Sequence, residues 1–268
     1  MIGALAPHAR AVGRSLRIYH APGRAAELDA FYRRFLGPGD LAFDIGAHVG
    51  DRTACFRRLG ARVVAVEPQP ALGRLLARLF RRDAMVTRIG ALVGAAPGAA
   101  AMWVNQANPT ISTASAAFIA AADGAPGWQG QSWDHAIERP VTTLDRLAAE
   151  HGRPDFIKID VEGYEAEALR GLFVAPRALS FEFTTIQRAL AAECLGLLAG
   201  LGYRAFNASL GESLVFAHAA PIGADAMALY LAALPDAANS GDVYASSETW
   251  RIGRTMGHNT NPVMIRLF

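Results

Sequence analysis

The amino-acid sequence predicts an α/β fold, a mostly parallel sheet with helices on both faces. Short runs rich in Val, Ile and Phe alternate along the chain with amphipathic stretches, the pattern of repeated strand and helix units. Gly46 and Gly50 follow the first of these runs, and Glu67 ends the second. A strand, a glycine turn, a helix and a second strand ending in an acid are typical of a Rossmann-like pocket for a ribose-bearing cofactor.

The first half of the chain supplies the elements around this turn. We expect a lead-in helix over residues 25–36 and a buried strand over 41–45, which ends just before Gly46. Because proline suits the first turn of a helix, Pro70 marks a helix start. The other elements expected in this half are helices over 51–59 and 70–82 and strands over 62–66, 85–89 and 101–104, the last at an edge of the sheet.

The alternation returns in the second half of the chain, after residue 140. We expect helices over 143–150, 166–172 and 186–201, strands over 156–159 and 178–183, and a closing pair of strands over 203–206 and 213–217.

The segment between the two halves, residues 105–140, has no periodicity and is rich in Gly, Ser, Asn and Pro. A long irregular connection inside a compact domain is usually a lid, a binding loop or disorder. We expect it to form the acceptor side of a pocket, with Trp128 and Trp133 available for stacking on a ring. The alternative is a surface loop that serves only as a spacer.

Composition narrows the class of protein. The formal net charge is +2 in 268 residues, 52% of them hydrophobic, and the arginine pairs fall on separate predicted helices, which argues against a nucleic-acid partner. Cys55 and Cys194 belong to no CxxC pair, so neither a disulfide framework nor a zinc site is expected. The apolar runs are interrupted by Pro97, Pro221 and Asp225, so no membrane insertion is expected. With no export signal visible, we predict a cytoplasmic protein.

One domain is expected for the whole chain, residues 1–268. It divides into a helical lead-in over 1–39, a core over 40–245 and a C-terminal tail over 246–268. The tail shows no periodicity, which leaves three alternatives: it docks on the body, exchanges with a second copy or is mobile. A homo-oligomer therefore stays open.

A carboxylate beside the glycine turn indicates the charge of the cofactor. Asp44 precedes Gly46 by two residues on the first strand. It would repel a pyrophosphate but attract a cationic ligand such as S-adenosylmethionine. Glu67 is then placed to reach the ribose hydroxyls.

A second group of charges lies in the segment DFIKIDVEGYEAEALRG, residues 155–171. Lys158, Asp160 and Glu162 fall at alternate positions, on one face if the strand continues, and at its carboxyl end. Buried charges are costly unless they are paired, so they are rarely incidental. In the alternative interpretation, Lys158 pairs internally with Asp160 or Glu182, and Glu162 caps the next helix.

Five motifs resemble those of one known family. The motifs DIGAHVG, AVEP, TTLDRL, KIDVEGYE and SFEF follow in this order over about residues 41–183. They are similar to the FkbM-type S-adenosylmethionine-dependent methyltransferases. The resemblance implies a class I methyltransferase sheet of seven strands with the last strand antiparallel. It also implies methyl transfer to a hydroxyl of a sugar, glycan or natural-product acceptor.

The resemblance also implies roles for particular residues. Asp44, Gly46 and Gly50 would contact the methionine end of S-adenosylmethionine, and Ala91 and Leu92 would lie near its adenine. His48 either touches the cofactor or only shapes the turn. Together the expected cofactor-binding residues are Asp44, Gly46, His48, Gly50, Glu67, Pro68, Ala91 and Leu92.

Methyl transfer to an alcohol requires a base for its proton. Asp160 is the first choice, at the position where related O-methyltransferases place a base or a metal-binding carboxylate. Glu162, Glu182 and His135 are further candidates. A divalent metal bridging Asp160 and another carboxylate is an alternative, but the sequence shows no compact ligand cluster, so no metal is predicted.

Two other functions remain in competition. A nicotinamide-dependent reductase uses a similar strand, turn and acid, but Gly46 and Gly50 do not form GxGxxG. A Tyr-x-x-x-Lys pair is also absent, because Lys158 is the only lysine and Pro154 stands four residues before it. The other candidate is a catalytically silent binding domain that keeps the cofactor fold.

Overall fold

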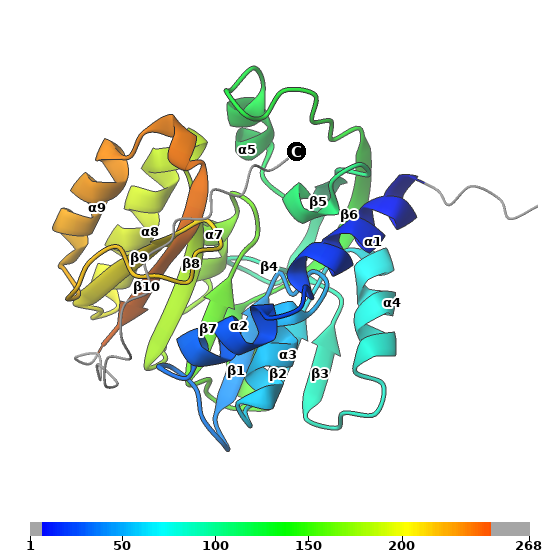
Figure 1. Ribbon diagram of the computed structural model, residues 1–268, viewed down its shortest axis with the longest axis horizontal. Coiled ribbons are helices and arrows are strands. Elements are labelled where there is room, and N and C mark those ends of the chain that lie inside the picture. Colours follow the sequence, from blue (N-terminus) through cyan, green and yellow to red (C-terminus); the bar gives the residue numbers. More distant parts are fainter. Residues whose placement is uncertain (1–6, 248–268) are drawn as a thin grey trace, which may run out of the picture.

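The computed structural model describes residues 7–247 as two sheets with surrounding helices (Figure 1). The large sheet has seven strands in the order β3-β2-β1-β7-β8-β10-β9. Only β10 runs antiparallel to its neighbours β8 and β9, so the mostly parallel sheet with an antiparallel last strand is confirmed. The strands are β1 (Leu41–Ile45), β2 (Arg62–Val66), β3 (Val86–Ile89), β7 (Phe156–Ile159), β8 (Ala178–Thr184), β9 (Ala205–Leu210) and β10 (Ser240–Ser246).

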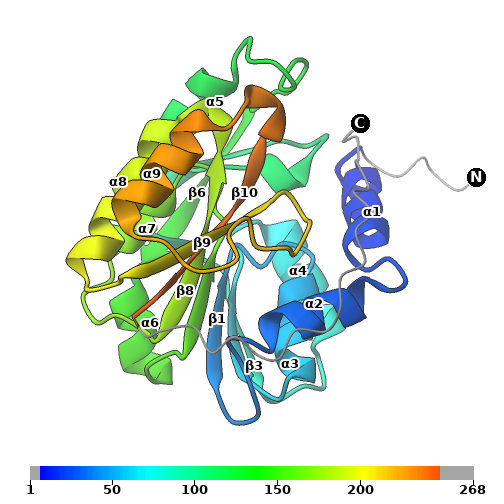
Figure 2. The same ribbon diagram turned by 60° about the vertical axis from the view of Figure 1, so that its left-hand side comes forward.

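Helices cover both faces of this sheet because its strands are apolar on both sides (Figure 2). In β1, Phe43 packs into the core on one face and Ala42 into the core on the other. The first core includes α6 (Leu144–His151), α7 (Glu165–Arg170), α8 (Arg188–Gly200) and α9 (Ala224–Ala233). The second includes α2 (Arg24–Tyr32), α3 (Asp51–Arg58) and α4 (Pro70–Leu79).

The segment over residues 105–140 is ordered, so its interpretation as an irregular loop is wrong. It contains a 3-10 turn, η1 (Pro109–Ile111), the helix α5 (Ala116–Ala122) and most of the strand β6 (His135–Thr142). The strand β6 pairs with β5 (Gly98–Val104) and β4 (Leu92–Val93) in the small sheet. Its burial alternates between half-buried and exposed, so it lacks the apolar run by which a buried strand is recognised in sequence.

Two helices and the last strand pair differ from expectation. The helix α1 (Pro7–Tyr19) was not predicted, although its exposed arginines at 10, 14 and 17 share one face and the buried Ala11 and Ser15 lie on another. The helix α9 was also missed. The segment over 213–217 is not a strand but touches β9 through a single bridge between Ser209 and Phe216. The partner of β9 is β10, whose Ser, Gly and Asp residues have low strand propensity.

The C-terminal tail is described only at its start. Ser246 ends β10, and residues 248–268 of the predicted tail lie outside the described residues. None of the helices within residues 7–247 is both long and apolar enough to cross a bilayer.

Aromatic packing under α2 gives a test of the second core. Phe156 is fully buried and stacks on Phe35 with ring centroids 5.0 Å apart. Phe156→Ala should lower the free energy of unfolding by about 3–5 kcal/mol, since it removes a buried ring and leaves a cavity. Phe173 is 75% exposed, so Phe173→Ala should change it by less than about 0.5 kcal/mol. Urea denaturation measures both, and equal effects would contradict this account of the core.

Candidate functional site

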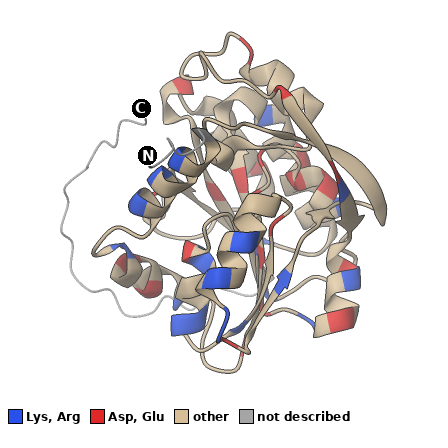
Figure 3. Cartoon of the chain, turned by 90° about the vertical axis from the view of Figure 1, so that its right-hand side faces the viewer, with Lys and Arg blue, Asp and Glu red and all other residues tan. Residues whose placement is uncertain are grey.

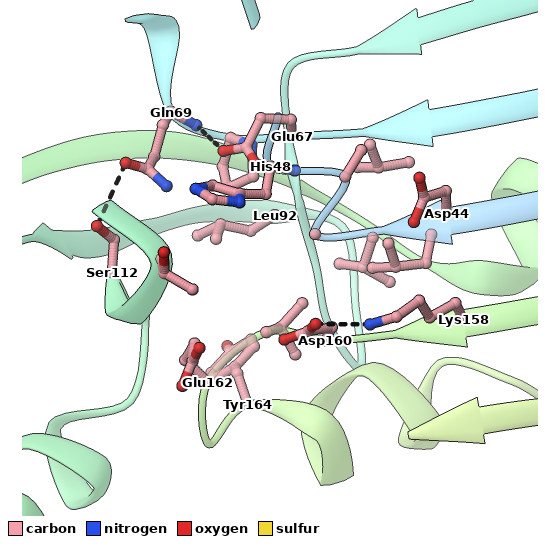
Figure 4. A pocket seen from close by; sticks show the side chains of 18 of the residues that line it. Asp44, His48, Glu67, Gln69, Leu92, Ser112, Lys158, Asp160, Glu162 and Tyr164 are labelled. Carbon is pink, nitrogen blue, oxygen red and sulfur yellow. Dashed lines mark hydrogen bonds and ion pairs between the residues drawn. The ribbon is translucent and has the colours of Figure 1, made fainter. Parts of the chain in front are cut away.

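A cavity opens where the carboxyl ends of β1, β2 and β7 meet (Figure 4). The volume of the cavity is about 820 Å³, including its open mouth. Open α/β sheets bind their ligands at this edge. The helix α1 and the turn η1 also reach it, through Tyr19 and Thr110. Most predicted site residues line it, namely Asp44, Gly46, His48, Glu67, Pro68, Ala91, Leu92, Asp160 and Glu162.

Two close approaches shape the glycine turn after β1. Gly46 has a φ of +80°, and a Cβ there would stand 1.8 Å from the carbonyl oxygen of Asp160. Gly50 has a φ of +78°, and its Cβ would stand 2.7 Å from Leu76, so it shapes the turn from behind the cavity. Only glycine fits either position without strain. Between them, His48 adopts the left-handed region with a φ of 48°.

Glu67, directly after β2, joins the glycine turn to the second strand. Its Oε2 accepts a hydrogen bond from the His48 N–H at 2.9 Å, and its Oε1 accepts one from the Gln69 N–H at 2.8 Å. The residue is 4% exposed. Burial raises the pKa of Glu67 to about 7, although the two N–H donors oppose the shift. Each carboxylate oxygen keeps a lone pair for a further donor.

Asp44 lies deeper, on the floor of the cavity. Its Oδ2 accepts a hydrogen bond from the Thr53 hydroxyl of α3 at 2.5 Å. Burial raises the pKa of Asp44 to about 6 in spite of this bond. The Asp44 carboxylate, which the sequence predicts beside the glycine turn, is therefore held in position by Thr53 of α3.

Sequence reasoning missed Gln69 and Tyr19, which line the cavity together with Ser112. The Gln69 Nε2 donates to the Pro109 carbonyl at 3.0 Å, and the Ser112 hydroxyl donates to the Gln69 Oε1 at 3.3 Å, which ties β2 to η1. The ring of Tyr19 lies edge-on to His48, with centroids 5.4 Å apart. Gln69 directly follows the AVEP motif and was within reach of prediction. Tyr19 belongs to no motif.

A buried ion-pair network was also missed. Arg52 of α3 is 5% exposed and pairs with Asp51 and with Glu212, the latter at 2.5 Å. Glu212 pairs as well with Arg24. Burial alone would raise the pKa values of Asp51 and Glu212, but the charge of Arg52 holds both below their usual range. Because 160 positions separate Arg52 from Glu212, no local spacing could have indicated the pair.

Lys158 lies in a row of polar side chains on the α2 and α3 face of the sheet. In the parallel ladder Lys158 is opposite Asp44, and its Nζ lies 2.5 Å from Asp160 Oδ2 and 3.9 Å from Asp242 Oδ1. Burial alone would lower the pKa of Lys158, but the two carboxylates raise it well above its usual range. Burial alone would raise the pKa of Asp160, but the ammonium of Lys158 outweighs it, and the pKa lies below its usual range. The internal pairing of Lys158 with Asp160 is therefore present, and Asp160 also lines the cavity.

Glu162 and Glu182 lie next to Asp160. One oxygen from each of the three carboxylates falls within 4.8 Å of the others. Burial, followed by the charge of Asp160, raises the pKa values of Glu162 and Glu182 well above the usual range. Glu182 is outside the cavity lining but adjoins it through Asp160. The compact cluster that the sequence did not reveal is thus present, because β7 and β8 run side by side.

The structure leaves three predicted residues away from this cluster. His135 is exposed at the start of β6 and does not line the cavity. Trp128 and Trp133 pack edge-on against Phe118, with ring centroids 5.2 and 6.0 Å away. The segment over 105–140 reaches the cavity instead through Thr110, Ser112 and Ala114. The two tryptophans therefore belong to a small separate core around Phe118 and do not line the cavity.

One comparison decides the family. The methyltransferase FkbM domain matches residues 44–205, more than half of the chain. The chain belongs to the FkbM methyltransferase family. The family uses S-adenosylmethionine, so the predicted cofactor is confirmed and the nicotinamide reductase is set aside. No curated protein gives a significant match.

Solved methyltransferases resemble this FkbM family member at low identity. The precorrin-6y C5,15-methyltransferase of Geobacter metallireducens is 12% identical with a TM-score of 0.42, covering 84% of this chain and 88% of its own. The TehB-like SAM-dependent methyltransferase of Corynebacterium glutamicum is 12% identical with a TM-score of 0.45, covering 90% and 98%. The fibrillarin of Aeropyrum pernix, with natively bound S-adenosyl-L-methionine, is 12% identical with a TM-score of 0.40, covering 78% and 67%.

The raised pKa of Glu67 predicts a pH dependence of stability. The folded-state pKa of about 7 exceeds the ordinary value of 4.5. A carboxyl group of this kind stabilises the fold below its unfolded pKa, and the contribution is lost as the pH rises through the folded pKa. The side chain of glutamine does not titrate, so the variant Glu67→Gln lacks this pH-dependent contribution. The free energy of unfolding of the wild type should therefore fall relative to Glu67→Gln between pH 4.5 and 7. Urea denaturation across that range measures it, and a constant difference would refute the shift.

Proposed function

We propose that this FkbM family member is an O-methyltransferase that acts on a hydroxyl of a sugar, glycan or natural-product acceptor. One observation carries the proposal. The carboxylates of Asp160 and Glu162 line the same cavity as the glycine turn and Glu67. A group that takes a proton from a hydroxyl therefore lies beside the place where a ribose-bearing cofactor fits.

The residues of the cavity fit S-adenosylmethionine. The glycine turn brings its backbone to the cavity at Gly46, and Glu67 can accept further hydrogen bonds from ribose hydroxyls. Among the described residues the buried His48 Nε2 has no hydrogen-bond partner, so it is available to a ligand. Asp44 adds a negative charge, which suits a sulfonium. When bound, S-adenosylmethionine supplies a methyl group activated by that sulfonium.

Cofactor placement follows from these positions. Asp44, Gly46 and His48 would face the methionine end, and Glu67 with Pro68 would hold the ribose. Ala91 and Leu92, 6% and 5% exposed, would give the adenine an apolar contact beyond β3. Gly50 would act by shaping the turn.

Asp160 is the proposed base. The ammonium of Lys158 lowers the pKa of Asp160 and so keeps the Asp160 carboxylate ionised. The Asp160 side chain is 34% exposed, and Asp160 lines the cavity. Glu162 and Glu182 hold their protons more tightly because burial raises their pKa values, so they are less ready to take another. His135 lies outside the cavity, which leaves it the least favoured of the four candidates. Thr110 and Ser112 provide hydroxyl groups on the acceptor side.

Binding of S-adenosylhomocysteine tests the cofactor half of the proposal. Hydrogen bonds to a charged group are worth roughly 1.5–3 kcal/mol. Glu67→Ala should therefore weaken binding about tenfold or more in calorimetry. Glu138→Ala, an exposed acid on β6, serves as the control and should leave the affinity unchanged. Unchanged affinity in Glu67→Ala would remove Glu67 from the site.

Turnover on hydroxylated acceptors tests the base. Asp160→Asn should keep S-adenosylhomocysteine binding but lower turnover on the order of a hundredfold, the range for loss of a general base. Asp134→Asn, at an exposed position, is the control. Near-normal activity of Asp160→Asn would move the role to Glu162 or Glu182. Tight cofactor binding by the wild type without turnover on a broad panel of hydroxylated acceptors would instead favour the catalytically silent domain.

A further inference from the structure

The cluster of Asp160, Glu162 and Glu182 is built from three separate backbone positions. Asp160 directly follows β7, Glu182 lies within β8, and Glu162 lies on the turn between β7 and α7. Each offers one carboxylate oxygen, and these oxygens lie within 4.8 Å of one another. Three like charges at such distances repel each other unless protons or a cation neutralise them.

Glu162 is the member that a structural role does not explain. It is 5% exposed, and within residues 7–247 its carboxylate has no hydrogen bond or ion pair. Figure 4 shows it beside Asp160 at the cavity, away from the ammonium of Lys158. Its carboxylate faces the cavity with no group in the described chain to balance its charge, so its position points to a ligand bound there. It also does not cap α7, since no bond to the helix is formed by its side chain among the described residues.

The turn that carries Glu162 is fixed by its surroundings. Its backbone lies in the left-handed region with a φ of 54°. The Thr113 hydroxyl donates to the Glu162 carbonyl at 2.6 Å. The Glu165 Oε1 accepts hydrogen bonds from the N–H groups of Val161 and Gly163 at 3.0 and 3.2 Å. The carboxylate of Glu162 is thus directed to the cluster by a backbone that is itself well bonded.

The charge around the cluster is also unbalanced. Glu182 Oε2 is buried and has no partner among the described residues. Lys158 is the one cation whose ion pairs reach the cluster in the described part of the chain, and it is shared between Asp160 and Asp242. With all three carboxyl groups ionised, one ammonium would leave the cluster a charge of two minus, so either protons or a cation must offset it. In Figure 3 acidic positions lie in the middle of the molecule as well as on outer elements, whereas many basic positions lie along outer helices.

We propose that Asp160, Glu162 and Glu182 bind a hard divalent cation, Mg²⁺ or Mn²⁺. Carboxylate oxygens without nitrogen or sulfur ligands select such ions. The inference rests on the proposed O-methyltransferase function, because the cation would lie beside the cofactor cavity and hold the acceptor hydroxyl as a further ligand. A bound cation lowers the pKa of a coordinated hydroxyl, which would ease loss of its proton to a neighbouring carboxylate or to water.

The dimensions agree with this ion class. Oxygens on opposite sides of an octahedral Mg²⁺ lie about 4.2 Å apart, since each bond is about 2.1 Å. The oxygens of the cluster lie within 4.8 Å of one another, so a small closure of flexible side chains is enough. Three protein ligands leave positions for water and for the acceptor, the open arrangement of a catalytic ion.

Manganese binding tests the site without any acceptor. The full chain is freed of metal with a chelator and titrated with Mn²⁺, and the free ion is followed by electron paramagnetic resonance. We expect one Mn²⁺ per chain, displaced by Mg²⁺. Glu162→Gln and Glu182→Gln should each weaken the affinity by at least about tenfold, since even loss of an outer-shell partner costs that much. Glu167→Gln, a partly exposed acid on α7, is the matched control and should bind Mn²⁺ like the wild type.

Absence of stoichiometric Mn²⁺ binding to the wild type would overturn the inference, and the carboxyl groups would then be neutralised by protons. Unchanged affinity in both glutamine variants would overturn it too. S-adenosylhomocysteine calorimetry on the same samples separates the two proposals. Intact cofactor affinity with no Mn²⁺ binding defeats only the cation site, whereas Mn²⁺ binding without cofactor affinity defeats the proposed methyltransferase function. That calorimetry also shows whether each variant is folded.

Discussion

A single buried ammonium group holds the carboxyl edge of the sheet together. Lys158 is the only lysine of the chain and is 3% exposed, with Asp160 on its own strand end and Asp242 on β10. Several carboxylates occupy one face of adjacent strands, and without this charge they would repel each other in a medium of low dielectric constant. The position of Asp160 at the cavity, and through it the geometry of the carboxylate cluster, depends on this contact.

Two left-handed residues that are not glycine stand on opposite sides of the cavity, His48 after β1 and Glu162 after β7. Such conformations persist only where surrounding contacts determine them, and they are common at functional sites. Here Gly46 connects the two turns, because its backbone passes directly against the carbonyl of Asp160. The glycine turn and the carboxylate cluster are therefore in direct backbone contact, so a shift in the turn after β1 would displace the backbone of Asp160.

The sequence predicted those parts of the fold and site whose causes are local. The glycine turn, Glu67 and the strand before Asp160 each follow from neighbours within a few residues, and each was recognised. Features that depend on distant partners were missed. Arg52 meets Glu212 only through tertiary folding, and the strand β10 is stabilised by pairing with β8 and β9, which are distant from each other in sequence. The carboxylate cluster needs the register of β7 against β8, which no spacing within one segment reveals.

The placement of β10 bears on how the chain folds while it is being synthesised. β8 and β9 are both complete by residue 210, but they do not pair with each other, because the strand between them is β10, residues 240–246. Until that segment leaves the ribosome, each has an unpaired edge, and the ammonium of Lys158 lacks Asp242. An exposed strand edge is a template for wrong pairing. Before β10 pairs, the nascent chain therefore exposes strand edges at which wrong pairing can start.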